Sequence, residues 1–217
     1  MHDALVAYAL SLDGLSYGRT PARYTAELYP YDTPQQAKQM ASSQSSCGLV
    51  CEAILRASGM DGRISWRGVP TNGLAIPYAA RYRRVPAVAY QVELARQRRH
   101  WVSSSGLRNE PLVSPEVGDM VLIGHGGAPD WGGVEHVLTV TGITGEQIES
   151  IDGGQVDPLN DGRPTAIRLV VRLLVRRQEQ GELWLVPPGT KLSSGGKPFG
   201  GKRVQGWIKA PLLPLLT

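Results

Sequence analysis

The sequence predicts an α+β fold, built as a single domain over residues 1–217. Three observations lead to this class. Helical patterns fill the first half of the chain, alternating strand patterns fill the second half, and no repeat or low-complexity linker separates them. The chain contains 26 glycines and 16 prolines but one phenylalanine, a composition that favours turns and short strands over a helical bundle.

The helices are expected from apolar spacing and from capping residues. Residues 45–58 form the clearest helix, because Ser46 or the serine before it can cap the start and Gly59 can close the end. Residues 33–42 begin with Thr-Pro, which is typical of a first helical turn. The segment 20–34 is expected to be irregular. Further helices are expected at residues 2–12, 76–83 and 86–97.

The strands are expected from alternating apolar and polar residues. A turn leads into the first buried strand, and a tight turn at residues 144–146 joins the next two. Residues 152–163 are expected to form a long loop. The core of the domain spans about residues 33–155, and residues 166–217 complete or extend the sheet. The predicted strands lie at residues 118–123, 136–143, 147–151, 166–177, 182–186 and 203–209.

The formal net charge is +4, and the basic residues occur in clusters. A basic surface attracts polyanions, including anionic cell-wall polymers, although such clusters are usually solvated faces. No nucleic-acid-binding motif accompanies them. No apolar run has the length of a membrane-spanning helix, and no basic start of a secretory signal is present. We therefore expect synthesis in the cytoplasm without a signal peptide, no membrane insertion and no nucleic-acid partner.

Both cysteines, Cys47 and Cys51, lie in the clearest predicted helix. The CxxxC spacing departs from the CxxC that is typical of zinc knuckles and redox pairs. A disulfide one helical turn apart has poor geometry. Two buried apolar thiols are the simplest alternative. We expect no metal and no cofactor.

The two cysteines differ in their position on the helix. Cys47 lies in the first turn, where the helix dipole and free backbone N–H groups stabilise a thiolate. The same N–H groups can donate to an oxyanion. Cys51 lies one turn deeper among apolar residues, where it is expected to pack. Cys47 is therefore the candidate nucleophile.

A thiolate nucleophile requires an imidazole and a group that orients it. His136 begins one predicted strand, and Asp152 follows the next. Because a tight turn joins these strands, the start of the first lies beside the end of the second. We expect His136 and Asp152 to be neighbours, with Asp152 or Gln155 orienting the imidazole.

The segments SCGLV (46–50), GDMVLI (118–123) and HVLTV (136–140), followed by Asp152, resemble the papain-like NlpC-type and CHAP-type cysteine peptidases and amidases. The resemblance covers roughly residues 33–155. It implies a papain-like fold, in which N-terminal helices carry the nucleophile at a helix N-terminus and pack on a mostly antiparallel sheet. The aspartate that usually precedes the cysteine is absent here.

The resemblance also implies a reaction. Cys47, His136 and Asp152 would hydrolyse an amide bond, through a thioester, in a peptidoglycan peptide of the bacterial cell wall. Gln44 and Gln155 are secondary candidates, as donors to the oxyanion.

Two residues of the glycine-rich loop 124–133 are candidate substrate contacts. Trp131 could cover the cleft or pack back onto the domain, and His125 could line the cleft or lie exposed. The features fit a lysin, or an antibacterial effector that a specialised secretion system exports to the periplasm or cell wall of a target cell. An effector would need an immunity protein as partner. The alternatives are a non-catalytic papain-like binding module, and a papain-like transferase or deamidase acting on a protein.

Overall fold

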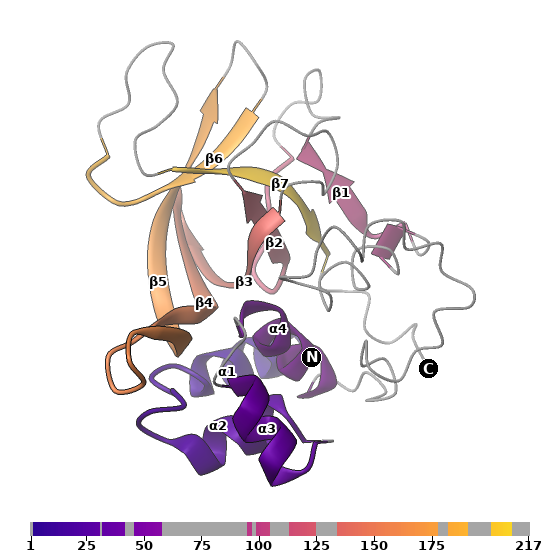
Figure 1. Ribbon diagram of the computed structural model, residues 1–217. Coiled ribbons are helices and arrows are strands. Elements are labelled where there is room, and N and C mark those ends of the chain that lie inside the picture. Colours follow the sequence, from indigo (N-terminus) through magenta and orange to yellow (C-terminus); the bar gives the residue numbers. More distant parts are fainter. Residues whose placement is uncertain are drawn as a thin grey trace.

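Helices come first along the chain and strands follow (Figure 1). The computed structural model describes residues 2–30, 32–41, 46–57, 95–96, 99–104, 113–124, 134–177, 182–190 and 201–209. The helices are α1 (His2–Ser11), α2 (Pro21–Leu28), α3 (Pro34–Ala41) and α4 (Cys47–Ala57). The strands are β1 (Trp101–Ser103), β2 (Met120–Gly124), β3 (Val134–Thr144), β4 (Gln147–Asp157), β5 (Arg163–Arg177), β6 (Glu182–Val186) and β7 (Lys202–Ile208).

The strands β2 to β7 form a closed antiparallel barrel. The strand order is β1-β7-β2-β3-β4-β5-β6, and β6 also pairs with β7, which closes the ring. Trp184 lies opposite Arg203 at this closure, and an ion pair of 3.3 Å joins Arg203 to Glu182. The short strand β1 pairs with the C-terminal part of β7, on the same side of β7 as β6.

The predicted papain-like α+β fold, with helices packed on a mostly antiparallel sheet, is therefore wrong. The protein is mostly sheet, and that sheet closes into a barrel with a few short helices beside it. The physical reason lies in β5, which has 15 residues. Its first part pairs with β4 and its last part pairs with β6. The long strand thus extends beyond β4 and places β6 where it can pair with β7, which closes the sheet.

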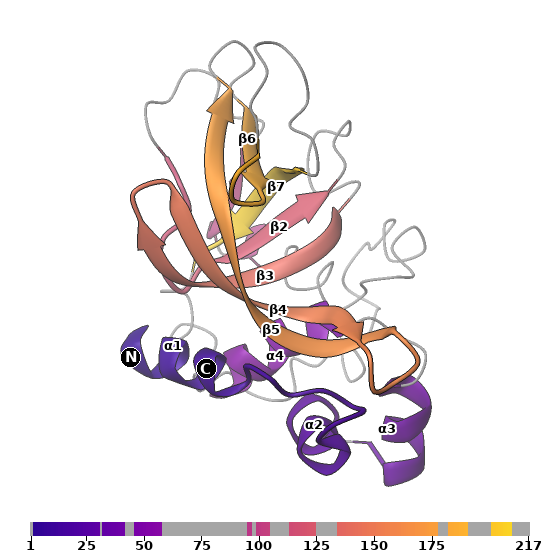
Figure 2. The same ribbon diagram turned by 90° about the vertical axis from the view of Figure 1, so that its left-hand side faces the viewer.

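Side chains alternate between two apolar cores. Along β3, Leu138 and Val140 belong to the core inside the barrel, whereas Val137 packs with the helices. The outer core joins the barrel wall to all four helices. Helix α4 lies against β3 and β4 (Figure 2). The inner core contains Val121, Ile123, Leu138, Val140, Ile148, Leu183, Leu185, Val204 and Trp207.

Several predicted elements are confirmed within one or two residues, among them α1, α3, α4 and β6. The irregular segment expected at residues 20–34 contains α2, which begins at Pro21 and buries Tyr24 and Leu28. The expected loop after residue 151 is wrong, because β4 continues to Asp157. The helices expected at residues 76–83 and 86–97 lie outside the described residues, apart from 95–96. No helix in the described ranges combines the length and apolar character needed to cross a membrane.

Gly206 is the position where β7 passes very close to β1. A methyl group there would lie 2.4 Å from both the Trp101 ring and the Val102 carbonyl oxygen. Gly206→Ala should lower the free energy of unfolding by about 1–3 kcal/mol, the usual cost of overpacking, in a urea titration. Gly142→Ala is the matched control, because its nearest neighbours would be atoms of the flexible Glu149 side chain. Equal losses at both glycines would contradict this account.

Candidate active site

Two glycines of β4 bring the barrel wall against the start of α4. The pairing of β4 with β5 shifts register between Asp152 and Gln155, at Gly153 and Gly154. The Gly154 N–H donates to Ser46 Oγ at 2.7 Å, and Gly154 has a φ of 72°, which favours glycine. A Cβ at Gly153 would lie only 2.8 Å from the carbonyl oxygen of Ser46. This contact holds the first residue of α4, the cysteine after Ser46, beside β4.

Cys47, His136 and Asp152 form one hydrogen-bonded chain. Leu138 of β3 lies opposite Asp152 of β4, which places His136 diagonally across from the carboxylate. His136 Nε2 donates to Asp152 Oδ2 at 2.7 Å. The Cys47 side chain also hydrogen-bonds to His136. Because Nε2 faces Asp152, Nδ1 is the ring nitrogen left for the sulfur. The expected contact between His136 and Asp152 is confirmed.

Arg172 of β5 and Ser150 of β4 hold the other side of the Asp152 carboxylate. Arg172 donates from Nη2 to Oδ2 at 2.6 Å and from Nη1 to Oδ1 at 3.2 Å. Ser150 Oγ donates to Oδ1 at 2.6 Å and accepts from Arg172 Nη1 at 3.1 Å. Asp152 has no exposed surface. Its two oxygens are thus satisfied by side chains from three adjacent strands.

The charges of this group follow from these contacts. Burial alone would raise the pKa of Asp152, but the hydrogen bond from His136 and the positive charges of His136 and Arg172 hold the pKa below its usual value. Burial would lower the pKa of His136, but hydrogen bonds with Asp152 and Cys47 outweigh it and raise this pKa to about 9. His136 is therefore protonated at neutral pH, and an imidazolium favours the thiolate of an adjacent cysteine.

Cys51 has a different environment. Its sulfur lies 3.5 Å from Thr139 Oγ1, and its side chain is fully buried. Burial raises the pKa of the Cys51 thiol strongly, so the thiol stays protonated. The prediction that Cys51 packs in the core is confirmed.

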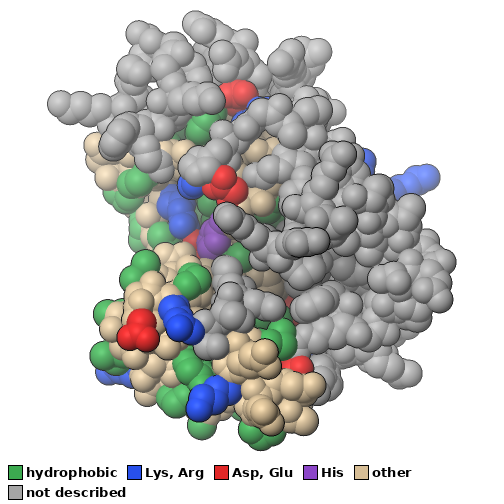
Figure 3. All heavy atoms as spheres, in the orientation of Figure 1, with side chains coloured by type: hydrophobic (Ala, Val, Ile, Leu, Met, Phe, Trp, Pro, Cys, Tyr) green, Lys and Arg blue, Asp and Glu red, His purple; other side chains and the backbone are tan. Residues whose placement is uncertain are grey.

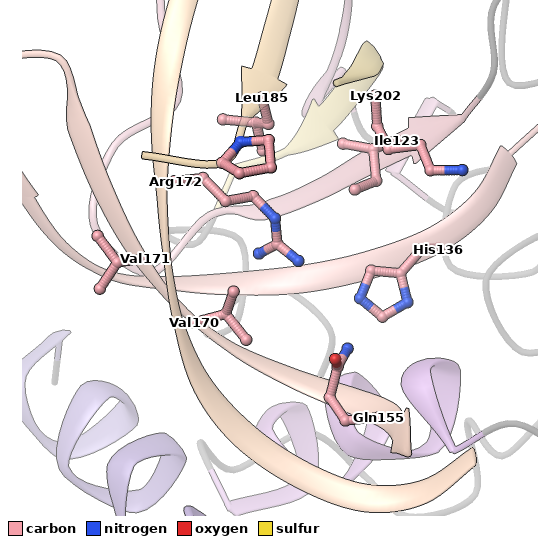
Figure 4. Close-up of a pocket in the computed structure, with 9 residues that line it drawn as sticks. Ile123, His136, Gln155, Val170, Val171, Arg172, Leu185 and Lys202 are labelled. Carbon is pink, nitrogen blue, oxygen red and sulfur yellow. The ribbon is translucent and has the colours of Figure 1, made fainter. Parts of the chain in front are cut away.

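A cavity of about 360 Å³ opens at the end of the barrel beside His136 (Figure 4). Each of the strands β2 to β7 contributes at least one lining residue, and Pro187 follows directly after β6. His136 has 17 % of its side chain exposed, whereas Cys47 has no exposed surface. The lining residues are Ile123, His136, Gln155, Val170, Val171, Arg172, Leu185, Pro187 and Lys202.

The remaining predicted site residues have different outcomes. Gln155 lies on the cavity wall, and the contact that orients His136 comes from Asp152. Gln44, His125 and Trp131 lie outside the described residues. Among the residues that the structure describes, no group of three or more histidine, cysteine or acidic side chains could hold a metal ion.

Sequence reasoning missed Arg172 and Ser150. Arg172 begins the basic cluster RLLVRR at residues 172–177, and the expectation for such clusters is a solvated face, yet its side chain is only 16 % exposed. The available signal was alternation: Ser150 and Asp152 are two residues apart on β4 and share a face. On the described part of the face in Figure 3, lysine and arginine side chains lie among acidic, apolar and polar ones and form no continuous patch.

Comparisons with protein-family models, with curated proteins and with solved structures find no match.

Arg172→Met should destabilise the protein by about 3–5 kcal/mol in a urea titration at pH 7, because it removes two charge-assisted hydrogen bonds and leaves His136 as the one remaining cation beside the buried carboxylate of Asp152. The variant should also unfold at a higher pH than the wild type during acid titration, since the pKa of Asp152 rises. Arg168→Met is the matched control. Arg168 lies directly opposite Asp152 in the β4–β5 register, but no ion pair joins them. A similar loss in both variants would refute the assigned role of Arg172.

The raised pKa of His136 predicts a pH-dependent stability. The folded-state pKa of about 9 exceeds the ordinary value of 6.5, so the stabilising contribution is complete below pH 6.5 and is lost as the pH rises through 9. A Cys47 thiolate in the wild type has released a proton and offsets this change, so the slope is measured in a Cys47→Ala background. There the free energy of unfolding should fall by up to about 1.4 kcal/mol per pH unit above pH 6.5. Urea titrations at four pH values from 6 to 9 measure this slope. His136→Gln should remove most of it, and an unchanged slope would contradict the assignment.

Proposed function

We propose that the protein is a cysteine hydrolase that cleaves amide bonds through a thioester formed on Cys47. The observation that carries this proposal is the chain Cys47–His136–Asp152. His136 Nε2 lies 2.7 Å from the carboxylate oxygen of Asp152, and the Cys47 side chain forms a hydrogen bond with the same imidazole ring. A nucleophile, a base and an orienting group in this order form the usual constellation for acyl transfer.

Each residue has a definite task in the proposed reaction. The Cys47 thiolate attacks the carbonyl carbon, and the protonated His136 gives its proton to the departing amine. Water then attacks the thioester, with His136 accepting a proton, and releases the acid. Asp152 fixes the tautomer and orientation of His136, and Arg172 keeps Asp152 charged and in place.

The start of α4 supplies the group that stabilises the oxyanion. Cys47 is the first residue of this helix, and the backbone N–H groups of a helix start point toward a bound anion. An N–H in this position can donate to the negative oxygen that forms during attack. Gln155, on the cavity wall beside His136, is a second candidate donor.

Peptides of the bacterial cell wall are the proposed substrates. The support is the resemblance of the segments around Cys47 and His136 to NlpC-type and CHAP-type enzymes, together with a net charge of +4 that suits an anionic polymer. An exported antibacterial effector or a lysin would act on this substrate. A transferase would use the same thioester and differ only in passing the acyl group to an amine instead of water.

Access to the sulfur is the main requirement that the proposal places on the structure. Cys47 is fully buried, whereas His136 lines the cavity. A substrate carbonyl therefore reaches the sulfur only after a neighbouring segment moves, as happens when loops gate an active site. Exposure of the thiol during such movements can be measured with an alkylating reagent.

Cys47→Ala should abolish release of peptides from purified cell-wall fragments, at least about a thousand-fold, because it removes the nucleophile. Cys51→Ala should retain turnover within a few-fold and lose only stability, since Cys51 contacts Thr139 and not His136. Mass spectrometry of the released fragments, and of the acyl-enzyme trapped in acid, provides the measurement.

The controls separate the possible failures. Equal release by the wild type and by Cys47→Ala would refute the nucleophile. Iodoacetamide should modify Cys47 in the native wild type much faster than Cys51. If neither thiol reacts before global unfolding, Cys47 is a sealed packing residue and the proposed function is wrong.

A further inference from the structure

The cavity beside His136 has a lining that selects for a particular ligand chemistry. Among the described residues that line it none is acidic, whereas Arg172 and Lys202 are cationic and Gln155 can donate an N–H. Lys202 donates to Glu135 at 2.8 Å, and Glu135 is 42 % exposed and does not line the cavity. The polar groups of the lining therefore favour a ligand that presents a carboxylate or carbonyl oxygen.

Two of these donors keep N–H groups that can bind a ligand. Arg172 donates three hydrogen bonds from Nη1 and Nη2 to Asp152 and Ser150, so two of the five N–H groups of its guanidinium remain for a ligand. Arg172 also lines the cavity. The Gln155 side chain points toward Arg172 and His136 in Figure 4. Within the described ranges its amide makes no side-chain hydrogen bond, so both of its polar ends are available to a ligand.

The other described lining residues, apart from His136, are aliphatic. Val170, Val171 and Pro187 form walls, and Ile123 and Leu185 belong to the inner core of the barrel. The volume of about 360 Å³ lies near the lower end of the range of roughly 300–1,000 Å³ for small-molecule sites. The space thus suits one residue with a short aliphatic side chain and not a long polymer segment.

We propose that this cavity binds the leaving residue of the substrate, as an amino acid with a short aliphatic side chain and a free α-carboxylate. The inference rests on the proposed function and specifies its substrate class: an N-acyl amino acid or the carboxyl end of a short peptide. The position of His136 supports it. The leaving amine, which receives the proton from His136, and the α-carboxylate are attached to the same Cα. When the amine lies at His136, the carboxylate therefore lies close to the hydrogen-bond donors that line the cavity next to His136.

The bond changes follow the proposed reaction. The Cys47 sulfur bonds to the carbonyl carbon preceding the last residue, the C–N bond breaks, and the nitrogen takes the proton of His136. The free amino acid leaves the cavity. Water then cleaves the thioester and yields the shortened acid.

The first test compares N-acetyl-Ala-Val carrying a free carboxylate with the same dipeptide as its carboxamide. The free acid should have a kcat/KM at least about ten-fold higher, because only the acid makes charge-assisted hydrogen bonds in the cavity. Equal values for the two compounds, or a preference for the carboxamide, would overturn the inference.

Variants of the Lys202–Glu135 pair test whether Lys202 is responsible for the preference for the free acid. Lys202→Met should raise KM for the free acid by about ten-fold and leave the carboxamide unchanged. Glu135→Gln is the matched control, since it breaks the same ion pair and keeps the ammonium, and it should leave both substrates unchanged. Losses of the same size in both variants would assign the effect to the broken ion pair and overturn the inference.

Gln155→Glu tests the cavity itself. The added negative charge should raise KM for the free acid, whereas a residue that stabilises the oxyanion would change kcat for both substrates. A fall in kcat alone would overturn the assignment of Gln155 to carboxylate binding.

Binding to Cys47→Ala distinguishes a failure of this inference from a failure of the proposed function. Calorimetry with the two dipeptides needs no turnover. Selective binding of the free acid, without turnover by the wild type, supports the cavity assignment and refutes the hydrolase. Turnover without selectivity refutes the cavity assignment and leaves the hydrolase intact. If neither binding nor turnover is observed, the cavity assignment and the proposed hydrolase are both overturned.

Discussion

The buried carboxylate of Asp152 is the interaction on which the candidate site and the adjoining barrel wall both depend. It has no exposed surface, and it accepts hydrogen bonds from His136 of β3, Ser150 of β4 and Arg172 of β5. A buried charge without such partners would cost several kcal/mol. The three strands must therefore keep one register at this point. The same requirement that holds the strands together also fixes the orientation of the imidazole.

The grouping of Cys47, His136 and Asp152 could be predicted because each signal is local. A cysteine directly after serines, which commonly precede helices, indicates a helix start, and two strands joined by a tight turn place one strand's start beside the other's end. Arg172 could not be recognised in this way. In sequence it is one member of a basic cluster, and only its partner on another strand distinguishes a buried arginine from a solvated one.

The closure of the sheet into a barrel could not be predicted from the sequence pattern. Alternation identifies strands one by one, and it located β3, β5, β6 and β7 closely. It does not indicate that β6 pairs with β7, because that pairing joins residues that are not neighbours in any local motif. The continuation of β4 past Asp152 was missed for a related reason. Gly153 and Gly154 suggest a loop, but they are needed where the strand touches the start of α4.

Burial does not distinguish the two cysteines, since both are fully buried. Their partners do. Cys51 meets the neutral hydroxyl of Thr139, and its thiol stays protonated. Cys47 meets His136, whose raised pKa keeps the ring positive at neutral pH and favours an anion on the sulfur. A thiolate that is paired but covered is protected from oxidation, which follows exposure as well as charge. In the proposed enzyme, burial of the nucleophile would restrict its reaction to the moments when a substrate opens the site.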